Sequence, residues 1–369
     1  MGTRLNTKPT QWITKMKLET FKRFILLFVW MLTFSCSDSI VNDNHDQESI
    51  IPGNRNYIWK IDTLDLDPFY YLSSIWGSSP NDVWATGTAG IWHYDGISWK
   101  SFGYFSGRNW SSIYGFSSDN IWATMVSRIY HYDGNNWNNS EEFIYPGYSL
   151  TYIEDIWGDS PNNIYAVGAV GNPNTSPKAI ILHYNGVSWK WVNIPNIEAA
   201  FFKIVKDSKG TGKYYLFGEN VIYDTTTTPV TLVGFVEKIF QYNGVTKIKE
   251  IYSSETEVRF VNEINGRVYF TSSGKSIIWK YLNGKYEVWK DFSDTGYKIG
   301  TLIGRSEMDL FCYSSSNQNF NKSILTHYNG TDIQPLFEAD NFFGFRIVDS
   351  DIFIIVEGNV RGIARGTPQ

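Results

Sequence analysis

Histidine is the side chain in this sequence best suited to metal binding or acid–base catalysis. Four of the five histidines share one local setting: His93, His131, His183 and His327 each precede a Tyr that is followed by Asp-Gly or Asn-Gly. A metal centre or a catalytic triad requires groups within a few ångströms of one another. Histidines that recur once per repeat are dispersed instead. We therefore expect them to bond to a neighbouring strand or repeat, and we predict no metal, no cofactor and no catalytic residue.

Paired carboxylates would indicate a different chemistry, the cleavage of glycosidic bonds. Hydrolysis of this kind uses two acidic side chains that face each other at roughly 5–10 Å. Asp155 lies near the end of a predicted strand and could supply one of them, but the sequence identifies no partner. Asp62, Asp65 and Asp67 alternate without the Asp-x-Asx-x-Asx-Gly order of a calcium loop, so we assign them to a solvated connection. Enzymatic activity is left undecided by these residues.

The two cysteines have different surroundings. Cys312 lies in the apolar run Leu310-Phe311-Cys312-Tyr313, where no group would lower its pKa. We expect a buried, unreactive thiol at this position. Cys36 follows the N-terminal apolar segment after one serine, and if it is lipidated no disulfide can form in the mature chain.

The N-terminal residues predict export. Lys17, Lys22 and Arg23 precede the apolar segment 24–34, which has the length of a signal-peptide core and is too short to span a bilayer. Ser35-Cys36 follows at once. This pair resembles a bacterial lipobox of the looser kind found in Bacteroidota lipoproteins, with Thr in place of the usual aliphatic residue three positions before the Cys.

From this resemblance we expect a signal peptide over residues 1–35, with Met16 as an alternative start, and lipidation of Cys36. Residues 36–56 are polar and are interpreted as a tether. The expected location is the bacterial cell envelope, as an outer-membrane lipoprotein that faces the periplasm or the surface. A plain signal peptide with a chance cysteine is the alternative.

Composition and charge restrict the partners. Aromatic residues make up 17% of the chain, which favours strands. The formal net charge is −5, and residues 1–35 hold six Lys/Arg and one acid. Removing them leaves 26 basic and 36 acidic residues, a net charge of −10. An acidic domain repels phosphate backbones, so we expect no nucleic-acid partner. We expect contact with the membrane only through the lipid, and a monomer.

One phrase recurs along the chain. Two full copies read SIWGSSPNDVWATGTAGIWHYDGISW (74–99) and SIYGFSSDNIWATMVSRIYHYDGNNW (112–137). A third begins IWGDSPNNIYAVG and ends IILHYNGVSW. More divergent copies occupy 213–244, 267–284, 308–330 and 342–358. Each copy reads as four strands, and periods of roughly 40–50 residues are typical of propeller blades.

Turn residues separate these predicted strands. Asp-Gly or Asn-Gly pairs occur at 95–96, 133–134, 185–186, 243–244, 283–284 and 329–330. Such pairs favour two-residue type I′ hairpin turns, which need positive φ at both positions. Trp and Tyr at equivalent repeat positions, such as Trp84, Trp122 and Tyr165, are expected to pack between adjacent blades.

The two ends of the repeat region complement each other. The seventh copy ends without a fourth strand, and an additional strand, 57–61, precedes the first copy. We infer that this strand completes the last blade and so removes a free sheet edge. The predicted fold is all-β, a seven-bladed β-propeller of four-stranded antiparallel blades over residues 57–369.

The phrase IWG-SPNDVWA-G followed by HYDG-SW resembles a family of bacterial propeller repeats and, distantly, the repeats of kelch and BNR propellers. The resemblance covers about residues 57–366. The sialidase Asp-box and the double glycine of kelch blades are absent. The resemblance therefore implies an architecture and carries no catalytic residue to this chain.

Loop lengths indicate where a ligand would bind. Connections from the second to the third strand of a blade, and from one blade to the next, vary in length and share one face. That face is expected to carry Tyr104, Asn172, Asn174, Phe235 and Asn317 beside our first choices for ligand contacts, Arg108, Trp110, Tyr145 and Tyr148. We predict an envelope lipoprotein whose propeller binds a protein or glycan ligand or serves as a scaffold in an envelope complex. The alternative is a polysaccharide-active hydrolase or lyase.

Overall fold

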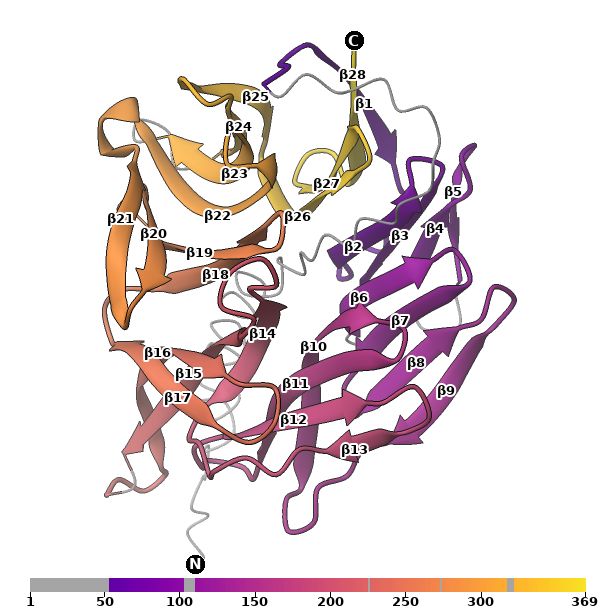
Figure 1. Ribbon diagram of the computed structural model, residues 1–369. Helices are drawn as coiled ribbons and strands as arrows, with labels where there is room; N and C mark the ends of the chain where they lie inside the picture. Colours follow the sequence, from indigo (N-terminus) through magenta and orange to yellow (C-terminus); the bar gives the residue numbers. More distant parts are fainter. Residues whose placement is uncertain (1–52, 103–109, 225, 273, 317–321) are drawn as a thin grey trace, which may run out of the picture.

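The computed structural model describes residues 53–102, 110–224, 226–272, 274–316 and 322–369. Within these residues the regular elements are the strands β1–β28 and one short 3₁₀ helix, η2 (Ser293–Thr295). The strands form seven four-stranded sheets arranged around one axis (Figure 1). The chain is a seven-bladed β-propeller, as predicted. No helix of the described part is long and apolar enough to cross a membrane.

Each blade is an antiparallel meander whose first strand lies closest to the axis. Blade 1 comprises β2 (Leu72–Ser79), β3 (Asp82–Gly87), β4 (Gly90–Tyr94) and β5 (Trp99–Ser101). Blade 2 comprises β6 (Trp110–Ser117), β7 (Asn120–Met125), β8 (Arg128–Tyr132) and β9 (Trp137–Glu142). Blade 3 comprises β10 (Leu150–Ser160), β11 (Asn163–Gly171), β12 (Lys178–Tyr184) and β13 (Trp189–Trp191).

The later blades repeat this plan with a more divergent sequence. Blade 4 comprises β14 (Ala200–Lys206), β15 (Tyr214–Asp224), β16 (Thr231–Tyr242) and β17 (Ile248–Ser254). Blade 5 comprises β18 (Arg259–Ile264), β19 (Arg267–Ser272), β20 (Ile277–Leu282) and β21 (Lys285–Asp291). Blade 6 comprises β22 (Tyr297–Ser306), β23 (Asp309–Ser316), β24 (Ser323–Tyr328) and β25 (Ile333–Ala339).

Blade 7 joins the two ends of the chain. It comprises β26 (Asn341–Val348), β27 (Asp351–Glu357), β28 (Gly362–Pro368) and, as its outer strand, β1 (Tyr57–Thr63). The pairing is antiparallel and runs from Tyr57 opposite Pro368 to Thr63 opposite Gly362. The predicted ring closure is therefore confirmed, and β28 has no free edge.

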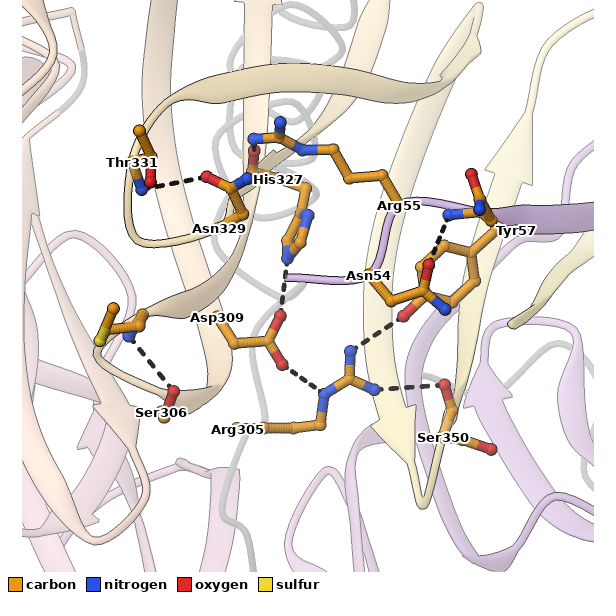
Figure 2. Close-up of polar contacts among 12 residues, drawn as sticks. Asn54, Arg55, Tyr57, Arg305, Ser306, Asp309, His327, Asn329, Thr331 and Ser350 are labelled. Carbon is orange, nitrogen blue, oxygen red and sulfur yellow. Dashed lines mark hydrogen bonds and ion pairs between the residues drawn. The ribbon is translucent and has the colours of Figure 1, made fainter. Parts of the chain in front are cut away.

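A buried polar network joins β1 to blades 6 and 7 (Figure 2). Arg305 donates to Asp309 at 2.6 Å, to the hydroxyl of Tyr57 at 2.9 Å and to the carbonyl of Ser350 at 3.3 Å. Asp309 also contacts His327 at 2.6 Å. Burial alone would raise the pKa of Asp309, but the hydrogen bonds from His327 and Arg305 hold it below its usual range. One arginine thus links three segments that are distant in sequence.

The repeated histidines are framework residues. In blade 1, His93 Nε2 lies 2.6 Å from Asp82 Oδ1, and the indole of Trp84 donates to the same oxygen at 2.9 Å. His93 also stacks on the Trp84 ring at 3.9 Å. The contact between His and Asx recurs at His131–Asn120, His183–Asn163 and His327–Asp309, and each of these histidines again stacks on an aromatic ring. The predicted bond to a neighbouring strand is confirmed.

Aromatic rings fill the spaces between blades. Trp84 lies 4.9 Å from Tyr132 and 5.6 Å from Trp137 of the next blade. Trp122 makes the corresponding contacts with blade 3, at 5.1 Å to Tyr184 and 5.7 Å to Trp189. Because each ring buries a large apolar area, these contacts hold neighbouring blades together without disulfides, as the repeat pattern indicated.

The Asx-Gly turns differ from the prediction in five of six places. Only Asn283 and Gly284, with φ of 51° and 84°, have the two positive values of a type I′ turn. In the other turns the glycine alone has positive φ, as at Gly96 (85°). There the Asx side chain accepts backbone N–H groups: Asp95 Oδ1 accepts those of Ile97 and Ser98, at 3.0 and 2.9 Å. The side chain thus stabilises a longer loop than the two-residue turn requires.

Candidate functional site

The two faces of the ring differ in their connections. The face that carries the turns between the first and second and between the third and fourth strands of each blade is here called the turn face. The opposite face carries the connections between second and third strands and between blades, and is called the loop face. In blade 4 the second and third strands extend toward this face, because β15 and β16 pair as far as Asp224 and Thr231.

The four predicted ligand-contact residues do not share one environment. Trp110 is 0% exposed, and its ring packs 4.9 Å from Tyr130 and 6.3 Å from Trp137. Trp110 is therefore a core residue and not a surface contact, because it begins the innermost strand β6 rather than ending a loop. Arg108 and Tyr104 lie outside the described residues, as does Asn317.

Tyr145 and Tyr148 do lie together on the loop face. Their rings are 5.8 Å apart, and Tyr145 is also 5.1 Å from Trp191 at the end of β13. Tyr145 is 37% exposed. We call Tyr145, Tyr148 and Trp191 the aromatic patch. The adjoining connection of blade 3 supports it, because Asn172 Oδ1 accepts the N–H of Ser149 at 2.9 Å.

The innermost strands carry a second repeated feature, a β-bulge near the loop face. In blades 1–4 and 7 the pairing with the second strand skips one residue, and blade 6 skips two. The single skipped residues are Ser73, Ser111, Glu154, Phe202 and Phe343. A bulged residue leaves the ladder, and its side chain is redirected relative to its neighbours. The ring therefore places one unpaired position per bulged blade at comparable depth.

Glu154 is the ionisable member of this set. It is 5% exposed, and its Oε2 has no hydrogen-bond partner among the described residues. Burial raises the pKa of Glu154 to about 8; a hydrogen bond from Ser111 lowers it and the charge of Asp155 raises it further. Glu154 therefore holds a proton through most of the neutral range.

The charge of Glu154 acts on two tyrosine side chains. Burial raises the pKa of Tyr71, just before β2, and the charge of Glu154 raises it further. The same two causes act on Tyr152 in β10. Tyr71 in turn lies 6.1 Å from Phe343 of blade 7. We call Tyr71, Ser111, Tyr152, Glu154 and Phe343 the axial cluster; its residues come from four blades.

Asp155, the one acid that the sequence offered for catalysis, has a structural role. Its Oδ1 accepts the hydroxyl of Ser112 at 2.8 Å, and its Oδ2 accepts the N–H of Ile204 at 3.0 Å. Burial raises its pKa, although the nearby Lys203 opposes this. Asp155 thus ties together the innermost strands of blades 2, 3 and 4, and both oxygens are engaged.

Polar side chains elsewhere on the innermost strands join neighbouring blades as Asp155 does, by accepting a backbone N–H from the next blade. Ser74 Oγ accepts the N–H of Ile113 at 3.2 Å, and Asn262 Oδ1 accepts that of Leu302 at 3.0 Å. The position therefore serves to connect innermost strands whatever polar residue occupies it.

A second acidic pair lies within blade 4. Glu219 and Glu237 are opposite each other on β15 and β16, and both are buried. Burial raises the pKa of Glu219 to about 7, while burial and the adjacent Glu219 charge raise that of Glu237 to about 9. The two carboxyls share a hydrogen bond, so one of them is protonated at neutral pH.

Other candidate chemistries find little support in the described part of the chain. No group of three or more His, Cys, Asp or Glu side chains in that part could hold a metal ion. Cys312 is buried, and burial raises its pKa to about 12, so its thiol stays protonated. Cys36 lies outside the described residues.

Glu154 was missed by sequence reasoning, but the repeat contains a signal for it. The residues before the Ile-aromatic-Gly phrase are Ser73-Ser74 in blade 1 and Ser111-Ser112 in blade 2. Blade 3 has Glu154-Asp155 at these positions. The change from serine to an acidic residue at the same repeat position distinguishes blade 3 from blades 1 and 2. Tyr71 and Phe343 carry no comparable signal.

No protein-family model and no curated protein matches the chain. Solved β-propellers are similar to it in structure. A streptogramin B lyase has a TM-score of 0.58 and 13% identity, covering 86% of this chain and 99% of its own. YCF48 bound to D1 peptide has 0.55 and 12%, covering 87% and 100%. The extracellular domain of a hybrid two component system from B. thetaiotaomicron has 0.53 and 13%, covering 85% and 42%. At these identities the likeness shows the propeller fold alone.

Proposed function

We propose that this chain is a cell-envelope lipoprotein, attached through Cys36, that presents its propeller as a binding module for a protein or glycan ligand. The observation that carries the proposal is the position of the aromatic patch on the loop face, while the chain enters the ring at the turn face. A ligand surface and an attachment point on opposite faces are what a tethered binding module requires.

The entry point is well defined. Arg55 donates to the carbonyl of His327 at 3.0 Å, next to the turn that joins β24 and β25 (Figure 2). It also donates to Asp332 at 2.8 Å. Gln369 donates its N–H to the carbonyl of Asn56 at 2.8 Å. Both ends of the ring therefore lie at the turn face. The residues between Cys36 and Gly53 span at most about 60 Å when extended, which keeps that face near the membrane.

The exposed groups of the loop face suit recognition of a polymer. Tyr and Trp offer apolar rings with a polar edge, and they are enriched where proteins bind proteins or stack on sugars. The amide side chains of Asn172 and Asn174 stand in the neighbouring connection, and both are exposed. The neighbours include a propeller bound to a peptide and an extracellular domain, which is consistent with such a role.

A second candidate function is a polysaccharide-active enzyme, and Glu154 is the observation that favours it. A carboxyl that keeps its proton near pH 7 is suited to protonate a glycosidic oxygen. Hydrolysis would also require a second carboxylate across the bond, and a lyase would require a base. Asp155 does not fill either role, because its oxygens are engaged in joining blades.

The proposal is tested with the full chain in detergent. Glycan arrays and immobilised envelope proteins are probed with the wild type, with Tyr145→Ala/Tyr148→Ala, and with Ile97→Ala as a turn-face control (Ile97 is 86% exposed). We expect at least a tenfold loss of capture with the double variant alone. Equal capture by all three proteins would reject the aromatic patch. Lipid attachment is checked by labelled fatty-acid incorporation, which Cys36→Ser should abolish.

A further inference from the structure

The turn face is divided into two sectors of opposite charge. In blades 1, 2, 6 and 7 the turn-face connections contain six acids and no basic residue, the acids being Asp95, Asp119, Asp133, Glu307, Asp332 and Asp349. The corresponding connections of blades 3–5 contain three lysines and one acid, Asp207. Two more lysines follow these connections closely, at the start of β13 and of β21.

The five lysines of blades 3–5 are exposed and form no ion pair with any residue that the structure describes. We call this set the basic sector: Lys190, Lys209, Lys213, Lys247 and Lys285. Lys213 donates to Oε1 of Gln241 at 3.0 Å, and Lys209 donates to Oδ1 of Asn265. Both acceptors are neutral amides, so these bonds leave the positive charges uncompensated.

The acids nearest to these lysines are already engaged. Asp207 is buried, and its carboxylate accepts the N–H groups of Thr211 at 2.6 Å and Val268 at 3.2 Å. Asp159, at the end of β10, pairs with Lys206 at 2.7 Å. The sector therefore keeps an excess of positive charge, although residues 36–369 as a whole carry −10.

The connections that carry the basic sector lie side by side. Blades 3, 4 and 5 are consecutive in the ring (Figure 1). The hydroxyl of Tyr165 in blade 3 donates to the carbonyl of Gly244 in blade 4 at 3.1 Å. The N–H of Lys209 in blade 4 donates to the carbonyl of Gly266 in blade 5 at 2.8 Å. The lysines therefore belong to one continuous surface.

Apolar side chains stand at the turn tips among these lysines. Val187 and Val245, which follow Asn-Gly pairs in blades 3 and 4, are 85% and 65% exposed. Leu282, which precedes the Asn-Gly pair of blade 5, is also exposed. Apolar tips surrounded by long basic side chains fit a bilayer interface, where the apolar groups enter the headgroup layer and the amines reach the phosphates.

We infer that the basic sector docks on a bilayer surface of anionic lipids, with its lysines at the headgroup phosphates and Val187 and Val245 at the interface. This contact goes beyond ligand binding, and it uses the proposed attachment through Cys36, because the tether joins the ring at the turn face. Docking there fixes the orientation of the ring and turns the loop face, with the aromatic patch, away from the membrane.

The negative charge of the whole domain opposes this contact, so the balance depends on distance. At about 0.1 M salt the Debye length is about 10 Å, and charges further from the bilayer than this are largely screened. The lysines nearest to the lipid therefore outweigh the distant acids. Each lysine close to an anionic surface increases binding by about fivefold, and the gain disappears as salt is added.

The test measures sedimentation with vesicles, using the mature chain (residues 36–369) with Cys36→Ser so that no acyl chain contributes. This chain contains every strand of the ring. The probes are vesicles of phosphatidylcholine alone and with about 40% phosphatidylglycerol. We expect at least tenfold tighter binding to the anionic vesicles at low salt, and loss of that difference at about 0.5 M NaCl. Equal binding to both vesicles would overturn the inference.

Two double variants separate the basic sector from net charge. Lys213→Gln/Lys247→Gln should weaken binding to the anionic vesicles at least tenfold. Lys178→Gln/Lys275→Gln makes the same change in net charge on the loop face, and it should bind as the wild type does. Equal losses in the two variants would show that net charge and not this surface governs binding. Circular dichroism melts confirm that both variants are folded.

A third variant and a solution measurement complete the test. Val187→Ser/Val245→Ser should weaken binding at least threefold, and an unchanged value would reject the apolar part of the contact. A dimer seen by light scattering without vesicles, and abolished by Lys213→Gln/Lys247→Gln, would assign the sector to a second copy of the chain instead of the bilayer.

The outcome is separable from that of the proposed function. Because the vesicle probe lacks an acyl chain, failure to bind rejects the bilayer contact only. Lipidation of Cys36 is decided by fatty-acid labelling, and ligand binding by the capture experiment with the Tyr145 and Tyr148 variant.

Discussion

The histidine–Asx pairs show how one substitution changes the ionisation of a repeated site. His131 and His183 are bonded to neutral Asn120 and Asn163, and burial lowers the pKa of both histidines. A histidine whose pKa is lower in the folded than in the unfolded state takes up its proton more readily when unfolded. Above about pH 6.5 these two sites do not lower the free energy of unfolding. As the pH falls below that value they lower it, because the unfolded chain binds protons more readily than the folded one.

The first prediction concerns Asn120→Asp. The new carboxylate reproduces the Asp82–His93 pair of blade 1, so it should raise the pKa of His131 and reduce the loss of stability at acid pH. Imidazole titration by NMR measures the pKa, and His183 serves as the unchanged control. A His131 titration that does not move would show that the acceptor's charge is not sensed by the ring.

The acidic pair of blade 4 has the opposite pH dependence. Glu219 and Glu237 have raised pKa values in the folded state, so the pair still shares a proton at neutral pH, while the unfolded chain ionises above about pH 4.5. Their contribution to stability is therefore present at acid pH. It is lost as the pH rises through about 7 to 9.

The second prediction follows for Glu237→Gln. The amide can replace the protonated acid as hydrogen-bond donor to Glu219, and it cannot ionise. We expect little change in the free energy of unfolding at pH 5 and a gain of about 1–3 kcal/mol at pH 9. Urea denaturation at the two pH values makes the measurement. A loss of stability at pH 9 would mean that the pair is held by something other than a shared proton.

Among the strands, the packing of β1 and of the turn between β26 and β27 against blade 6 depends on one buried ion pair, Arg305–Asp309. The side chain of Asp309 is 2% exposed, and Arg305 connects it to Tyr57 of β1 and to the turn between β26 and β27. Removing one partner of a buried pair leaves an uncompensated charge, which is more costly than losing a surface contact.

The third prediction compares two arginines. Arg305→Ala should lower the free energy of unfolding by about 2–4 kcal/mol, because His327 remains as a partner of Asp309. Arg128→Ala removes a more exposed pair with Glu142 and should cost less than about 1 kcal/mol. Chemical denaturation of both variants measures the difference. Equal effects would show that the network does not hold the ring closed.

For the whole molecule, closure is what distinguishes a ring from a stack of sheets. Without β1, the strand β28 would expose its unpaired N–H and C=O groups along a full edge. Such an edge pairs readily with another chain. The aromatic packing between blades does not protect it, because β28 would become an outer strand.

The fourth prediction tests this with a chain that lacks residues 57–63. We expect a lower melting temperature and oligomers or aggregates at micromolar concentration, as seen by size-exclusion chromatography. A chain that begins at residue 53 is the control and should elute as a monomer. A monomeric truncated protein of unchanged stability would show that β1 is not needed to close the ring.

Local patterns were sufficient for most of the architecture. Strands, turns and their period are properties of neighbouring residues, so the recurring phrase predicted the blades, and the missing fourth strand predicted the pairing of β1 with β28. The histidines were assigned to the framework for the same reason. The predicted turn type was wrong in most copies, because the Asx side chain stabilises a longer loop than the Asx-Gly dipeptide alone suggests.

Local sequence therefore accounts for the periodic part of this protein, whereas the contacts between distant residues depend on how the blades pack around the ring. Burial of Trp110 and the contact between Tyr145 and Trp191 depend on how strands end and pack. The axial cluster draws on residues from position 71 to position 343, which only ring closure brings together. A bulge also redirects Glu154 out of the strand alternation, and no local hydrophobic pattern encodes that change of direction.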